Sequence, residues 1–547
     1  MIPILAKGML STSGDSVALI GSSCNDCHSK EFPAKTICTK CQSTDVQNIS
    51  LGDNGYIWTF TIQRFEPPEP YAPQGDDFQA FAVGYVALPS GVMVKSRIDA
   101  PDLAAIKIGA EVRLTTSHFK LDDELYQIPC YLVESETSNS ENFESNRQDS
   151  RTAEKVNHTY TYTPTPTDDV IIAGIGMHKF GRHKEVSALE QGAFAVREAL
   201  KDSGFGWHDM QFAFGGSADG GNPDSLLNYL GTTGLPFINI FNGCATGGSI
   251  LLSAVNAIQS GQYDIGLAVG FDKHPRGAFR VSPEDWGLDS FWGSAGMMVT
   301  AQYFGMKIQR YMHDFGISNS SLAMVAAKAF ENGAKNDNAW RRQPLSEAEI
   351  LESNLVVDPL RKYMLCSPGE GGVALVVCHR RHAHRLRNKA VFIAGVSVKS
   401  RPPGSFDVFN TSQTTGWAKG PSGLAADDVF FRTGIERKDV KVAQLQDTEA
   451  GAEIIHMSEC GFCADGEQEE WIQAGTTKIS GHLPINTDGG CLANGEPIGA
   501  SGLRQIYEVC LQLREKAGPR QVAHRPNLGF THVYGAPGLS AVSLLKV

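Results

Sequence analysis

The sequence predicts a mixed α/β protein whose two similar halves pack as layers, with helices covering the sheets, behind a small β-rich module that holds a metal. Three observations predict this fold class. Paired cysteines and short strand-like segments occupy the first quarter of the chain, and a segment almost free of aliphatic residues follows them. The rest of the 547 residues alternates strand and helix signals, and one strand signal returns later in the chain.

Composition describes a large globular protein with an acidic balance. Hydrophobic residues make up 41% of the chain and charged residues 20%, and the formal net charge is -12. This charge excludes a general nucleic-acid binder. No apolar run approaches the ~18 residues that a membrane-spanning helix needs, and the first residues lack the pattern of a secretory signal. We therefore expect a cytoplasmic protein with reduced cysteines and no membrane span.

Four cysteines near the N-terminus have the spacing of a metal site. Two C-x2-C pairs, Cys24 with Cys27 and Cys38 with Cys41, are separated by ten residues. This spacing suits a tetrahedral zinc ion held by four thiolates. Because four thiolates leave no open position for substrate or water, we expect the zinc to be structural.

A small barrel is predicted directly after the cysteine pairs. Five short segments are rich in β-branched and aromatic residues and are punctuated by proline and glycine, which favours an OB-type barrel. These segments are residues 55–63, 80–88, 92–98, 111–117 and 125–133.

The α/β part shows the same opening twice. Residues 170–175 form a buried-strand signal, and Ser187 with Glu190 forms a capping box at the start of a helix that Gly204 is placed to end. A similar strand signal returns at 391–396, which favours an internal duplication.

We divide the chain into five segments from these signals. The segment at 134–167 is rich in Ser, Thr, Asn, Glu and Pro and cannot bury enough apolar surface to order itself, which predicts a flexible linker. The predicted segments are the N-terminal segment with the zinc ribbon (1–50), the barrel (51–133), the linker (134–167) and two α/β halves (168–388 and 389–547).

Cys244 is the candidate nucleophile. An apolar strand runs into the small-residue turn Asn242-Gly243-Cys244-Ala245-Thr246-Gly247-Gly248, and a helix through about Ser260 follows. Unsatisfied N–H groups at a helix N-terminus favour thiolate over thiol, so residue type and predicted geometry agree on a nucleophile. The alternative is a buried structural cysteine in a tight strand–helix turn.

This turn resembles the nucleophile motif of thiolases, especially those of the sterol-carrier-protein-x type. The resemblance covers residues 168–547 and includes four further motifs, GIGMHKF at 174–180, CSPGEGG at 366–372, NTDGG at 486–490 and GEPIGASG at 495–502. It implies a duplicated thiolase fold with α-β-α-β-α layers, a coenzyme A thioester as substrate and a homodimer. The N-terminal region resembles the zinc-ribbon/OB proteins that accompany such thiolases as separate subunits.

Two catalytic positions of the thiolase motifs carry other residues here. Glu496 stands where thiolases have the histidine that takes the proton from the nucleophile. Gln446 and Thr448 replace a histidine and a cysteine of the sterol-carrier type. Glu496 can serve as a base, although its charge disfavours a neighbouring thiolate, and Gln446 can donate a hydrogen bond to a thioester oxygen. The alternative is that Gln446 and Thr448 are packed loop residues.

The C-terminal loop at 532–538 supplies three more candidate residues. Gly535 lies where a thiolase backbone N–H helps to form the oxyanion hole. Tyr534 belongs to a Tyr-Gly-Ala-Pro-Gly sequence that resembles the loop of thiolase-related steroid side-chain aldolases, so its phenol can move a proton, and His532 can orient it. The alternative for Tyr534 is a packing residue.

These residues predict an enzyme that acts on a carbon–carbon bond of an acyl-CoA. The first interpretation is a thiolase-type acyltransferase that cleaves or forms a bulky β-ketoacyl-CoA through Cys244. The second is a retro-aldolase on a β-hydroxyacyl-CoA with a sterol or aromatic side chain, in which Tyr534 is central. The third is a non-catalytic lipid- or CoA-binding scaffold for a partner enzyme of a CoA-dependent pathway.

Overall fold

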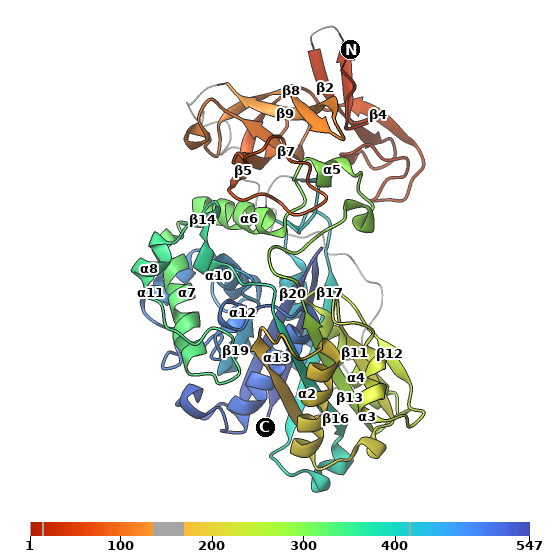
Figure 1. Ribbon diagram of the computed structural model, residues 1–547, viewed down its shortest axis with the longest axis vertical. Coiled ribbons are helices and arrows are strands. Elements are labelled where there is room, and N and C mark those ends of the chain that lie inside the picture. The colour runs from red at the N-terminus through yellow and green to blue at the C-terminus, as the bar shows by residue number, and fades with distance from the viewer. Residues whose placement is uncertain (1, 14–15, 135–168, 415–416) are drawn as a thin grey trace.

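The computed structural model describes residues 2–13, 16–134, 169–414 and 417–547 (Figure 1). The predicted linker therefore lies outside the described residues, except for Glu134. The Glu134 carboxylate pairs with Arg113 of the barrel at 2.6 Å, so the barrel's contacts reach this residue. None of the helices in the described ranges combines the length and the apolarity needed to cross a bilayer.

Two β-sheets form the N-terminal module. In the first, strand β2 pairs with β1, β3 and β4 and carries Cys24 at its end. The second is a five-stranded barrel in the order β5-β6-β7-β9-β8, closed by pairing of β5 with β8, which confirms the predicted barrel and its five segments. The strands are β1 (Leu10–Ser13), β2 (Ser16–Cys24), β3 (Lys30–Glu31), β4 (Val46–Ser50), β5 (Asn54–Gln63), β6 (Phe81–Ala87), β7 (Val92–Asp99), β8 (Glu111–Leu121) and β9 (Glu124–Val133).

One nine-stranded sheet runs through both α/β halves. Its order is β12-β11-β13-β16-β10-β17-β21-β20-β19, and β10 and β17 join the halves through only two residue pairs. In each half the first strand pairs with the last strand in the antiparallel direction, β10 with β16 and β17 with β21. The other strands of each half follow on the far side of the last strand. The strands are β10 (Val170–Gly181), β11 (Phe212–Gly216), β12 (Phe237–Asn239), β13 (Ile265–Lys273), β16 (Glu370–His379), β17 (Val391–Ser400), β19 (Val442–Leu445), β20 (Leu528–Gly535) and β21 (Leu539–Lys546).

The helices complete five layers. Helices α4 and α13 share one apolar core with strands of both half-sheets, so they form the central layer. Helix α2 packs on the outer face of the first half-sheet and α9 on that of the second. The α-β-α-β-α arrangement confirms the predicted fold class and the repeated topology. The helices are α2 (Ala188–Ser203), α4 (Thr246–Gln259), α9 (Pro421–Thr433), α10 (Ala450–Glu459), α11 (Glu467–Gln473), α12 (Gly490–Asn494) and α13 (Ile498–Leu513).

The predicted start of the first half is also observed. Ser187 and Glu190 form a capping box at the N-terminus of α2, and Gly204 ends the helix in the left-handed conformation. Both features follow from local sequence, because a side-chain cap satisfies free N–H groups and glycine adopts positive φ without a steric penalty.

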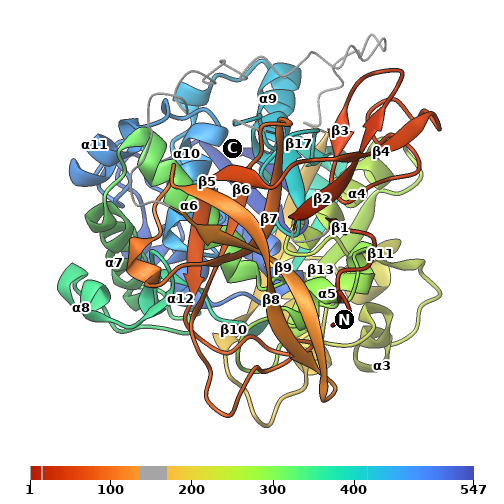
Figure 2. The same ribbon diagram turned by 90° about the horizontal axis from the view of Figure 1, so that it is seen from above.

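The barrel lies across the end of the α/β body, with α6 beneath it (Figures 1 and 2). Two short strands of the body extend the barrel sheet: β14 pairs with β5, and β18 pairs with β7. The barrel core is continuous with apolar residues of the body such as Trp292 and Phe406. The elements of this junction are α5 (Phe291–Ser294), α6 (Thr300–Phe315), β14 (Leu355–Val357), β15 (Leu360–Arg361) and β18 (Ser412–Thr414), and α7 (Asn319–Ala334) and α8 (Glu347–Glu352) follow α6 in the chain. Helix α3 (Leu227–Leu230) lies away from the junction, beside α2.

Candidate active site

Cys244 lies in the turn just before α4 and contacts the C-terminal loop. Gly243 has a φ of 54°, and a Cβ atom at this position would lie 2.7 Å from the backbone oxygen of Ala536. A Cβ atom at Gly535 would lie 3.0 Å from the Cys244 nitrogen. Glycine on both sides therefore permits this close approach, and the structure brings Gly535 directly against the Cys244 turn.

Glu496 is buried near Cys244 and is held by two hydrogen-bond donors. Its carboxylate accepts hydrogen bonds from the Ser501 hydroxyl at 2.7 Å and from the Gln446 amide nitrogen at 3.2 Å to each oxygen. The Gln446 side-chain oxygen accepts from Gln505 at 3.2 Å. Gln446 therefore orients Glu496 in this structure, whereas the sequence predicted a donor to the thioester oxygen.

The thiol of Cys244 is not activated by its surroundings alone. Burial raises the pKa of Cys244 well above its usual value, and the charge of Glu496 raises it further. The expectation of a thiolate stabilised by the helix N-terminus is therefore wrong for this structure, because desolvation and a carboxylate in contact outweigh the partial charge of the helix. The surroundings of Cys244 therefore favour the neutral thiol in this structure.

A second thiol near Glu496 belongs to Cys366. Cys366 is part of the motif at 366–372, but the sequence predicted no role for it. Its backbone N–H donates to the Thr448 oxygen at 2.9 Å, and burial followed by the charge of Glu496 raises its pKa well above the usual value. Thr448 itself faces a neighbouring pocket.

Tyr534 lies in that pocket and is paired with a buried carboxylate. Its hydroxyl donates to Asp407 at 3.0 Å and accepts from the Val408 backbone N–H at 3.3 Å. Burial raises the pKa of Tyr534 well above its usual value, and Asp407 adds to this effect. Burial likewise raises the pKa of Asp407, which makes this carboxylate a stronger base than an exposed one.

The pocket is a narrow cavity of about 30 Å³, and all the residues that line it belong to the α/β body. Its walls combine aromatic rings with a few charged groups, a composition typical of ligand sites. Lys307 Nζ lies 6.0 Å from the centre of the Tyr534 ring and pairs with Glu459 at 2.9 Å. The lining residues are Tyr303, Phe304, Lys307, Phe406, Asp407, Val408, Thr448, Glu449, Ala452, Ile455, His456 and Tyr534.

His532 does not contact the Tyr534 hydroxyl in the way the sequence predicted. Its Nε2 atom lies 2.9 Å from the hydroxyls of Ser422 and Ser540, and its ring lies 4.3 Å from that of His456. Burial lowers the pKa of His532 well below its usual value. We therefore describe His532 as a neutral packing residue behind the pocket.

Sequence reasoning missed four ionisable residues of the pocket, Lys307, Asp407, Glu449 and His456. They come from three separate segments, since Glu449 and His456 both belong to α10 and its N-cap, and only the fold brings these segments together. Burial raises the pKa of Glu449 to about 8, and burial lowers the pKa of His456 to about 3. Such shifted groups in a pocket are typical of functional sites.

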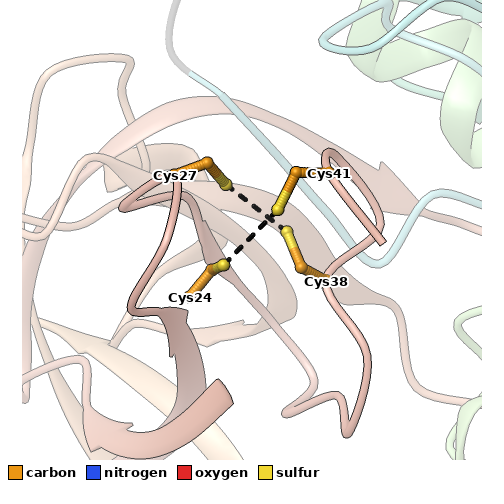
Figure 3. Close-up of side chains that lie close together, drawn as sticks. All are labelled: Cys24, Cys27, Cys38 and Cys41. Atoms are coloured by element: carbon orange, nitrogen blue, oxygen red, sulfur yellow. Dashed lines mark hydrogen bonds between the residues drawn. The ribbon is translucent and has the colours of Figure 1, made fainter. Parts of the chain in front are cut away.

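The four N-terminal cysteines converge as predicted (Figure 3). All four sulfur atoms lie within 4.8 Å of one another, with Cys27 and Cys38 at 3.5 Å and Cys24 and Cys41 at 3.6 Å. Tetrahedral zinc with Zn–S bonds of about 2.3 Å needs sulfur atoms about 3.8 Å apart, so the cluster fits the ion. Within the described ranges this is the one group of cysteine, histidine or carboxylate side chains with a metal-site arrangement.

Comparison with known proteins identifies the family. The benzoylsuccinyl-CoA thiolase subunit BbsB of Thauera aromatica is 30% identical over 379 residues, which cover 94% of that protein and 67% of this chain. The chain belongs to the thiolase superfamily. A family model described as thiolase C-terminal domain-like matches residues 405–545, and the model of the ChsH2 C-terminal OB-fold domain matches 49–117. The chain therefore combines a part of the thiolase superfamily with an OB-fold module.

Two further comparisons describe relatives of this chain. An acetyl-CoA acetyltransferase of Methanothermobacter thermautotrophicus is 28% identical, and the match covers 98% of that protein and 68% of this chain. The structure of an Ltp2-ChsH2(DUF35) aldolase matches 70% of this chain and 99% of that chain, with a TM-score of 0.62 and 25% identity. The chain is thus a thiolase-superfamily enzyme, with thiolases and an aldolase among its relatives.

Proposed function

We propose that this enzyme cleaves a bulky β-ketoacyl-CoA, with Cys244 as nucleophile and Glu496 as the base that activates it. The observation that carries this proposal is a carboxylate that Ser501 and Gln446 hold in place, close enough to Cys244 for its charge to act on the thiol. A nucleophile, a nearby base and a group that orients the base form the arrangement of nucleophilic catalysis.

The proposed reaction begins when Glu496 takes the Cys244 proton. The sulfur attacks the ketone carbon and forms a C–S bond, and the bond between the ketone carbon and the α-carbon then breaks. Its electron pair passes into the thioester enolate, which takes up a proton and leaves as an acyl-CoA. The thiol of a second coenzyme A attacks the acyl-enzyme and frees Cys244. Backbone N–H groups of Cys244 and Gly535 are proposed to stabilise the oxyanion, a role supported by the packing of Gly535 against the Cys244 turn.

The bulky substrate group is proposed to enter at the pocket beside Tyr534, which has to widen to admit it. Aromatic side chains of Tyr303, Phe304 and Phe406 line it, and Thr448 and Glu449 lie on the loop that also carries Gln446. This loop connects the pocket with the Cys244 cluster. The name of the Thauera aromatica relative, a benzoylsuccinyl-CoA thiolase subunit, supports an aromatic acyl group.

Mass spectrometry of the intact protein tests this proposal. Purified enzyme is mixed briefly with a panel of aliphatic and aromatic β-ketoacyl-CoA esters without free coenzyme A, beside the Cys244→Ala variant. We expect an acyl adduct on the wild type that the variant lacks. Cleavage without any adduct in either protein would refute the covalent mechanism.

A second reaction is favoured by the pairing of Tyr534 with Asp407. In a retro-aldol cleavage, Tyr534 accepts the β-hydroxyl proton of a β-hydroxyacyl-CoA while its own proton passes to Asp407. The bond between the α- and β-carbons breaks, a ketone or aldehyde leaves, and the thioester enolate takes up a proton. The similarity to an aldolase structure supports this alternative. It predicts turnover that Tyr534→Phe abolishes and Cys244→Ala preserves, and the reverse pattern would refute it.

A homodimer through the α/β halves is proposed as the assembly. Strand β12 is the end strand of the nine-stranded sheet, and Ile238 and Phe241 beside it are 51% and 56% exposed. An edge strand with exposed apolar residues is a surface that a second copy can cover. We also propose a partner enzyme, of a class that supplies or consumes the acyl-CoA.

A further inference from the structure

Strand β7 of the barrel points a buried lysine toward the α/β body. Lys95 Nζ donates to the backbone oxygen of Met297 and lies 3.6 Å from the centre of the Tyr303 ring. Lys95 is only 2% exposed, and the salt bridges found among the described residues include none from this side chain.

A lysine in this environment is costly. Burial lowers the pKa of Lys95 well below its usual value, which means that the folded protein disfavours the charged amine. Replacing the amine with an apolar side chain removes this desolvation cost, and the hydrogen bond to Met297 is the interaction that is lost in exchange. A residue that lowers stability is retained most readily where it serves function.

The groups that Lys95 contacts belong to the frame of the pocket. Met297 lies just before α6, Tyr303 is in the first turn of α6, and Lys307 follows one turn later. Tyr303 and Lys307 both line the pocket, and Lys307 lies over the Tyr534 ring. Lys95 therefore contacts the start of α6 directly.

The residue opposite Lys95 holds another wall of the same pocket. Tyr85 of β6 pairs directly with Lys95, so both side chains lie on one face of the barrel. The Tyr85 hydroxyl donates to the Asn410 backbone oxygen, and its ring lies 5.4 Å from that of Phe406. Asp407, the partner of Tyr534, lies in this strap, which we define as residues 405–414 and which includes β18.

We propose that Lys95 is a positioning residue that fixes α6, and with it Tyr303 and Lys307, relative to Tyr534 and Asp407. The inference rests on the proposed function, because it takes this pocket as the place where the substrate binds. The barrel is then a part of the active-site frame rather than a separate ligand carrier.

Lys95→Met tests this role, because the methionine keeps the length of the side chain and removes the donor. We expect an unchanged or higher midpoint of thermal unfolding together with at least a tenfold lower kcat. The matched control is Arg64→Met, which removes the barrel's ion pair with Asp358 on the β14 side, away from the pocket. We expect this control to keep wild-type kcat. A lower midpoint with unchanged kcat in Lys95→Met would overturn the proposal.

Hydrogen–deuterium exchange of the free proteins gives a readout that needs no substrate. Lys95→Met should speed exchange in the start of α6 and in the strap, and leave β8 and β9 as in the wild type. Wild-type exchange in α6 and the strap would refute the positioning role. If the wild type turns over no ester of the panel, the proposed function fails, and exchange alone then decides the role of Lys95.

Discussion

The contact between Glu496 and Cys244 predicts an unusual response of the thiol to mutation. Glu496→Gln keeps the size of the side chain and removes the charge that raises the pKa of Cys244. Two unit charges about 4 Å apart interact with about 4 kcal/mol at an effective dielectric constant of 20, which corresponds to about three pKa units. Because burial still opposes ionisation, we expect a decrease of at least about one unit.

Alkylation by iodoacetamide at pH 7.5, followed by mass spectrometry of the Cys244 peptide, measures this change. A pKa that remains above the assay pH gives a tenfold larger thiolate fraction for each unit that it falls, so Cys244 should react about ten times faster or more. Glu449→Gln is the control, since this carboxyl is buried nearby but is not among the groups that shift the pKa of Cys244. An equal or slower alkylation of Cys244 in Glu496→Gln would refute this electrostatic explanation. The same variant should also lose C–C cleavage, because it lacks the proposed base.

Three further predictions concern other parts of the molecule. Metal analysis of the purified protein should find one zinc ion per chain. The Cys24→Ser variant should lose the zinc and unfold at a lower temperature. Zinc retained in this variant would exclude the four-cysteine site. Because the pKa of His456 is lowered in the folded protein, the unfolded chain binds more protons than the folded chain between about pH 6.5 and 3. The free energy of unfolding therefore falls as the pH falls through this window. His456→Asn, which keeps a donor toward Gln446, should show a shallower decrease of the unfolding midpoint, and an unchanged slope would contradict the assignment. Ile238→Arg should convert a dimer into a monomer in analytical ultracentrifugation, and a wild-type monomer would dismiss the dimer proposal.

Local patterns were sufficient to predict much of the architecture. The capping box at Ser187, the five barrel strands and the cysteine spacing depend on residues close in sequence, and each is observed. The layered fold followed from motifs that keep their order along the chain.

The electrostatics of the site could not be predicted in the same way. A helix N-terminus is visible in sequence, whereas the desolvation of Cys244 and its contact with Glu496 depend on residues about 250 positions apart. The same holds for Asp407, which meets Tyr534 only because the strap crosses the pocket. The hydrogen bond from Gln446 to Glu496 likewise needs two loops to be placed side by side.

The shared sheet between the barrel and the body bears on how this chain can evolve. Lys95 and Tyr303, or Tyr85 and Phe406, touch although more than 200 positions separate them. A substitution that changes the side-chain volume at one member of such a pair requires a compensating substitution at the other. These positions should therefore covary among homologous fused chains. A barrel transplanted from a related protein would bring the wrong partners, and the module is therefore not interchangeable even where its own fold is preserved.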